Sequence, residues 1–133
     1  MSTNYGVIFE EYAERHYIKN FEKKYKSAWN ITRRAITEEF KRFDGLFETS
    51  IAETIIDGDD IKICKTEFRV AGTKDSRKSS GNRCITALCR EDSIYMVRVL
   101  LVYHKNDIKG GGNETARWKQ IIKENYPEYK KLL

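Results

Sequence analysis

The chain has 133 residues, of which 40% are hydrophobic and 34% are charged, and its formal net charge is +5. This length leaves no room for a second hydrophobic core, so we expect a single domain over residues 1–133. The longest apolar run, Ile94–Tyr103, is interrupted by Arg98 and is too short to cross a bilayer, which argues against a membrane partner.

The first half of the chain predicts one strand followed by helices. Residues 5–9 have the pattern of a short strand, and from Tyr17 to Tyr25 every fourth residue is aromatic, as in a helix. A second helical stripe consists of Thr32, Ala35, Ile36, Phe40 and Phe43. It ends near Asp44 and Gly45, and Ser27–Asn30 is either a joint between two helices or part of one long helix.

The second half predicts a run of strands and a final helix. The expected strands are residues 61–70, which alternate between apolar and polar, then 83–89 and 94–103, and the last of these should be central. A helix with a stripe of Trp118, Ile121 and Ile122 should end at Pro127. The order β-α-α-β-β-β-α predicts an α+β fold with a small, mostly antiparallel sheet and helices packed on one face.

The charge is unevenly distributed along the chain. The first 60 residues carry a net charge of −3, whereas residues 61–133 carry +8. Within Lys62–Arg90 eight basic residues are opposed by two acidic ones. A concentration of this kind is typical of a surface that binds a polyanion, although a charged stretch can also be a solvated face.

The polar loop between the first two of these strands gathers cations and hydroxyl groups. The candidate phosphate-binding residues are Arg69, Lys74, Arg77, Lys78, Ser80 and Arg83. Arg83 opens a strand, so it should be held more rigidly than the loop lysines, as the stabilisation of a transition-state charge requires. A mobile, soluble hairpin loop is the alternative interpretation.

His104 stands where the most apolar strand ends, between Tyr103 and Lys105. An imidazole there can transfer a proton near neutral pH, and Tyr103 can stack on an unpaired base. The alternative is a structural histidine. These residue types suit RNA cleavage by attack of the 2′-hydroxyl on its own phosphate, which needs a base, an acid and cations but no metal and no cofactor.

Other motifs give weaker signals. Gly110–Gly112 precedes a helix without a P-loop pattern, so we interpret it as a hinge rather than a phosphate site. The acidic groups at Glu38–Glu39 and Asp57–Asp60 look like a helix surface and a turn, without metal-ligand spacing. Three cysteines without a ligand pattern are interpreted as reduced thiols in strands, which predicts a cytoplasmic protein.

The sequence resembles the RelE/HigB-type toxins of bacterial toxin–antitoxin systems. The residues that carry the resemblance are Phe68-Arg69-Val70, the Ser-Ser-Gly turn with its arginine at Ser79–Arg83, and Val99–Lys105, where a last strand ends in a basic cluster. The order of the expected elements is similar as well.

This resemblance implies that the protein cleaves messenger RNA, typically on the translating ribosome, and that a cognate antitoxin blocks it. By position, Arg83 would bind the scissile phosphate, and Lys105 or His104 would belong to the basic catalytic cluster. The family's C-terminal tyrosine has two candidate matches, Tyr126 and Tyr129.

A messenger-RNA endonuclease is therefore the leading hypothesis. Two alternatives remain open: a relative of the same fold that poisons DNA gyrase without cleaving RNA, and a plain nucleic-acid-binding module. Ordered cations at Arg69, Arg83 and Lys105 favour the nuclease. The chain shows no helix-turn-helix pattern, which a DNA-binding module would be expected to have.

Overall fold

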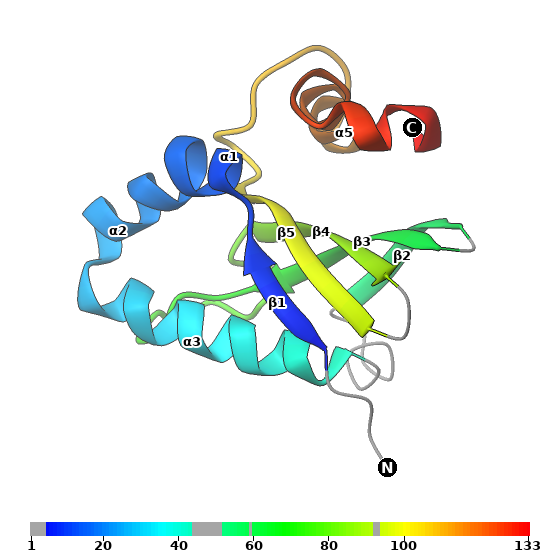
Figure 1. Ribbon diagram of the computed structural model, residues 1–133. Coiled ribbons are helices and arrows are strands. Elements are labelled where there is room, and N and C mark those ends of the chain that lie inside the picture. The colour runs from blue at the N-terminus through cyan, green and yellow to red at the C-terminus, as the bar shows by residue number, and fades with distance from the viewer. Residues whose placement is uncertain (1–4, 44–51, 59, 92–93) are drawn as a thin grey trace.

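The computed structural model describes residues 5–43, 52–58, 60–91 and 94–133. Five strands form one sheet in the order β1-β5-β4-β3-β2 (Figure 1). The strands are β1 (Gly6–Phe9), β2 (Ala52–Asp57), β3 (Ile61–Phe68), β4 (Asn82–Glu91) and β5 (Ile94–His104). The helical segments are α1 (Glu11–Ala13), the π-helical η1 (Glu14–Ile18), α2 (Lys19–Tyr25), α3 (Ser27–Lys41), α5 (Glu114–Asn125) and the 3-10 helix η2 (Pro127–Leu132). None of the helices in these ranges has the length and hydropathy that crossing a membrane requires.

The sheet is mixed, because β1 runs parallel to β5 while the other neighbouring strands are antiparallel. The expected α+β class and the mostly antiparallel pairing are thus confirmed. The expected order lacked β2, which pairs with β3 and ends at Asp57, a residue we had placed in a turn. The strand expected to be central, β5, is an interior strand, and β4 is the middle one.

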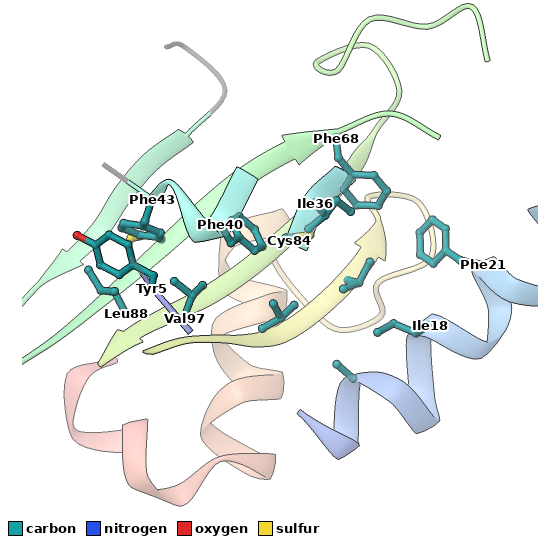
Figure 2. Packing of buried hydrophobic residues seen from close by; sticks show 14 of the residues in the cluster. Tyr5, Ile18, Phe21, Ile36, Phe40, Phe43, Phe68, Cys84, Leu88 and Val97 are labelled. Atoms are coloured by element: carbon teal, nitrogen blue, oxygen red, sulfur yellow. The ribbon is translucent and has the colours of Figure 1, made fainter. Parts of the chain in front are cut away.

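Helices cover both faces of the sheet, so the expectation of helices on one face was wrong (Figure 1). On one face α3 and η1 enclose a core that contains Ile18, Phe40 and Phe68 (Figure 2). On the other face α5 and η2 bury Trp118 and Tyr126. The physical reason lies in β4 and β5, whose side chains are apolar on both sides and must be covered twice.

A β-bulge interrupts β5. The register of β4 with β5 shifts between Ile85 and Thr86, which leaves Leu100 as the extra residue. Leu100 and its neighbour Leu101 both lie in the core on the α5 side. Beyond the bulge the strand alternates again, and Tyr103 also belongs to the core beneath α5.

The open question of one long helix or two is resolved at Lys26. The backbone of this residue has φ 52° and ψ −121°, which separates α2 from α3. α3 ends at Lys41. The end that we predicted near Asp44 and Gly45 falls outside the described residues.

The three cysteines are free and buried, in β3 and β4 as expected. Burial raises the pKa of the Cys64 thiol to about 12, and it also raises the pKa of Cys84. Both thiols therefore stay protonated at neutral pH and act as small apolar groups in the core.

Candidate nucleic-acid interface

The turn that precedes β4 is held by Ser80, one of the predicted RNA-binding residues. Its buried hydroxyl lies 2.5 Å from the carbonyl oxygen of Phe68 and 2.7 Å from that of Arg77, and it accepts a hydrogen bond from the backbone N–H of Asn82 at 3.1 Å. Its hydrogen-bonding capacity is therefore used inside the protein. Ser80 shapes the loop rather than facing a ligand.

Gly81 brings this turn against His104. Its φ is +78°, and a Cβ atom built on it would lie 2.6 Å from Nε2 of His104, so a larger residue is excluded by both geometry and space. The backbone N–H of Lys105 donates to the carbonyl of Gly81 at 2.8 Å. The Ser-Ser-Gly turn thus fixes the end of β5 and the imidazole beside it.

The imidazole of His104 has a defined orientation. Its Nδ1 accepts a hydrogen bond from the backbone N–H of Asn106 at 3.1 Å. In the neutral ring the proton is consequently on Nε2. His104 is half-buried, so this nitrogen is held in place and solvent can still reach the side chain.

The side chain of Arg83 lies on the opposite face of the sheet from His104. Arg83 pairs in register with Tyr103, and His104 pairs with Asn82, so successive residues of each strand point to opposite sides. The Arg83 side chain is only 8% exposed. Its two Nη groups donate to the backbone carbonyls of Asn82 and Lys78 at 3.1 and 3.3 Å.

Beneath α5, Glu114 completes a charged cluster with Arg83. Its carboxylate accepts a hydrogen bond from the Tyr103 hydroxyl at 2.7 Å, and the same oxygen, Oε2, lies 3.1 Å from Lys65 Nζ and 3.9 Å from Arg83 Nε. Burial alone would raise the pKa of Glu114, but these hydrogen bonds and the two cations outweigh it and lower the pKa. Burial, followed by the bond to Glu114, raises the pKa of Tyr103, which therefore remains a phenol.

This cluster is covered by a firmly packed helix. Trp118 and Ile122 of α5 are fully buried, and the Tyr126 hydroxyl donates to the carbonyl of Leu100 at 2.8 Å. Tyr129 is buried as well. The two tyrosines considered as matches for a catalytic residue are thus parts of the core, and they do not lie beside His104.

On the other face a small pocket of about 50 Å³ opens at the end of the sheet. Its lining consists of Asn20, Phe21, Lys24, Tyr25, Asn82, His104 and Asp107. It combines an imidazole, a carboxylate, an ammonium group and an aromatic ring. The Oδ1 atom of Asn82 is buried there without a hydrogen-bond partner.

The predicted loop cations fall into two groups. Arg77 forms a bidentate ion pair with Glu39 of α3, which raises the pKa of the arginine and ties the loop to the helix. Arg69 is exposed, and within the described part of the chain its one side-chain hydrogen bond goes to the Thr73 carbonyl of its own loop at 3.4 Å. The ammonium groups of Lys74, Lys78 and Lys105 are exposed, with no hydrogen bond or ion pair to the described residues.

A larger cavity of about 430 Å³ lies toward the opposite end of the strands. It is lined by Glu10, Asp60, Ile61, Cys89, Arg90, Arg98, Glu128 and Tyr129. Carboxylates and guanidinium groups are mixed there, and Arg98 pairs with Glu10 at 3.1 Å. Its three carboxylates outnumber its two guanidinium groups, which disfavours a polyanion, whereas one ammonium group balances one carboxylate in the small pocket, so the small pocket is the better candidate.

The sequence singled out His104 as a candidate residue but gave no indication of the side chains that surround it in the structure. Lys24, Tyr25 and Asp107 come from α2 and from the loop after β5, and no local motif links them. Among the described residues, no three His, Cys, Asp or Glu side chains are placed to hold a metal ion. No family model, curated protein or solved structure matches this chain.

Proposed function

We propose that this protein is an endoribonuclease that binds single-stranded RNA at the His104 pocket and cleaves it by attack of the 2′-hydroxyl. The observation that carries the proposal is the composition of this pocket. An imidazole and a carboxylate from the end of β5 and the turn after it share one small cavity with a cation from α2, and Asn82 of β4 in its lining keeps an unpaired acceptor.

The reaction assigns a role to each of these groups. The carboxylate of Asp107 accepts the proton of the 2′-hydroxyl as the bond from O2′ to phosphorus forms. The Nε2–H of the neutral His104 ring donates a hydrogen bond to a non-bridging oxygen of the phosphate, and the Lys24 ammonium gives a proton to the 5′-oxygen as the bond from that oxygen to phosphorus breaks. Lys24 also stabilises the charge on the phosphorane, and the ring of Tyr25, whose centre lies 5.3 Å from Lys24 Nζ, holds this ammonium group in place. The products are a 2′,3′-cyclic phosphate and a 5′-hydroxyl, and no metal is required.

Free cations supply the attraction for the RNA backbone. Lys74 and Lys78 lie in the loop between β3 and β4, and Lys78 comes just before the turn that packs on His104. Lys105 follows this histidine directly. Because these ammonium groups are unpaired, each can neutralise a phosphate and release its counterions. Arg77, in contrast, is already neutralised by Glu39.

The resemblance to RelE/HigB-type toxins extends the proposal to its biological setting. We propose messenger RNA, free or on the ribosome, as the substrate, and a cognate antitoxin as the protein partner that blocks the site. The fold is compatible with this proposal in its α+β class and in the position of the Ser-Ser-Gly turn against the last strand.

The first test compares His104→Gln with His16→Gln. His16 is exposed in η1 and contacts the ring of Tyr12, so the second variant removes an imidazole away from the pocket. Purified protein is incubated with single-stranded RNA in EDTA. Cleavage should fall by about 100- to 1,000-fold in His104→Gln and remain unchanged in His16→Gln.

The product ends and a cellular assay complete the test. Products should carry 2′,3′-cyclic phosphate and 5′-hydroxyl ends, and Asp107→Asn should slow the reaction by about 100-fold. Induction in cells should create new 5′ ends inside coding sequences. Intact messages together with accumulating gyrase–DNA breaks would identify the gyrase poison instead, and equal rates for wild type and His104→Gln would exclude this pocket.

A further inference from the structure

The junction between α2 and α3 has an unusual backbone. Lys26 is the one non-glycine residue with positive φ among the residues that the structure describes. Its φ of 52° and ψ of −121° belong to the first central position of a type II′ turn, where glycine is normally required. The other residues with positive φ are Gly72, Gly81, Gly110 and Gly112.

The fold needs this kink but not the lysine side chain. The backbone N–H of Lys26 donates to Glu22 at 2.9 Å, and its carbonyl accepts from the N–H of Trp29 at 3.0 Å, which glycine would do equally well. The side chain is exposed and forms no hydrogen bond or ion pair with the described residues. A non-glycine residue that strains the backbone, and whose side chain forms no stabilising contact, is typical of a functional position.

The position of Lys26 indicates which function this is. It directly follows Lys24 and Tyr25, which line the His104 pocket. We propose that Lys26 binds the RNA phosphate next to the one at His104, so that the strand continues from the pocket across the α2–α3 junction. This inference rests on the proposed function, and it adds a second phosphate subsite beyond the pocket residues.

The test uses substitution by glycine, which should separate stability from binding. Lys26→Gly relieves the backbone strain, so the melting temperature should rise by about 3 °C. The same variant should bind a labelled, fully 2′-O-methylated RNA about five-fold more weakly. The slope of log Kd against log [KCl] should decrease by about 0.7, as expected for one lost phosphate contact on a single strand.

Two further variants serve as controls. Lys26→Arg keeps the charge and should retain the wild-type affinity. Lys130→Ala removes an exposed lysine of η2, which packs on the other face of the sheet, and should leave the affinity unchanged. Wild-type affinity and salt dependence in Lys26→Gly, while His104→Gln is still inactive, would overturn this inference alone. Failure of the wild-type protein to bind and cleave RNA would overturn the proposed function and this inference with it.

Discussion

The two faces of the sheet differ sharply where β4 begins and β5 ends. On one face Arg83 and Tyr103 are buried with Glu114 under α5, and their charges and hydroxyl are compensated. On the other face their sequence neighbours Asn82 and His104 line an open pocket. Adjacent residues in the same two strands therefore meet opposite environments.

The difference in burial and pairing between the two faces distinguishes a side chain that stabilises the fold, Arg83, from one that can still bind a ligand, His104. The Arg83 side chain is buried, its two Nη groups donate to backbone carbonyls and its Nε lies 3.9 Å from the Glu114 carboxylate, so this arginine holds the turn beside it. A half-buried imidazole with one free nitrogen, beside an unpaired amide oxygen, retains its capacity for binding. The positive charge of a sequence segment does not distinguish these two situations, whereas burial and pairing do.

The largest expected effect tests whether the α5 face is structural. Trp118→Ala removes a fully buried side chain and should lower the free energy of unfolding by about 3–5 kcal/mol. Gln120→Ala on the exposed side of the same helix should change it by less than about 0.5 kcal/mol. Urea denaturation measures both, and a loss below about 1 kcal/mol for Trp118→Ala would mean that α5 is not firmly packed.

Arg83→Ala comes next and tests the comparison directly. It leaves Glu114 without one cation and two carbonyls without their donor, so the free energy of unfolding should fall by about 2–3 kcal/mol. At a temperature where the variant is folded, its RNA affinity should stay within about two-fold of wild type. Unchanged stability with lost cleavage would contradict this and would favour the contact with the scissile phosphate that the family resemblance implies.

Glu114→Gln should have a smaller and pH-dependent effect. Because the pKa of Glu114 in the folded state is lowered below its ordinary value of 4.5, its charge contributes stability above that pH. This contribution to stability is lost as the pH falls from 4.5 through the pKa that Glu114 has in the folded state. The carboxylate is partly exposed, so we expect about 1 kcal/mol at pH 7. Denaturation curves of wild type and variant should converge in acid, and a constant difference down to pH 2 would refute the assignment.

The smallest effect on stability is expected for Asn82→Ala. The buried Oδ1 of Asn82 has no partner, so its removal should change the free energy of unfolding by less than about 0.5 kcal/mol. RNA affinity should nevertheless fall by about 1 kcal/mol if the amide contacts the ligand. A loss of stability comparable to that of Arg83→Ala would remove the contrast between the two faces.

Periodicity predicted the strands that alternate and the helices that carry one stripe. Residues 61–70 reveal β3 because polar and apolar side chains alternate along it. β2 was missed because its six residues, Ala52–Asp57, lack a regular alternation. The signal for helices on both faces was present in the nearly continuous apolar run Val97–Tyr103, which indicates a strand that is covered on both sides.

The site was predicted only in part because its residues come together through tertiary packing. Chain order marked His104 as the end of an apolar strand, but the contact of the Ser-Ser-Gly turn with this histidine appears only in the structure. Local patterns could not show that Glu114 pairs with Arg83, because Glu114 belongs to α5, which begins ten residues after His104. Nor could they show that Lys24 reaches the pocket from α2.

The bulge at Leu100 determines which side chain reaches the pocket. In a regular strand Leu101 would face α3, and every later residue would change sides. The phenol of Tyr103 would then point to the face with the small pocket, while the imidazole would be buried against Glu114. The extra leucine thus determines which face of the sheet each later residue of β5 points to. It places the imidazole of His104, rather than the phenol of Tyr103, at the pocket.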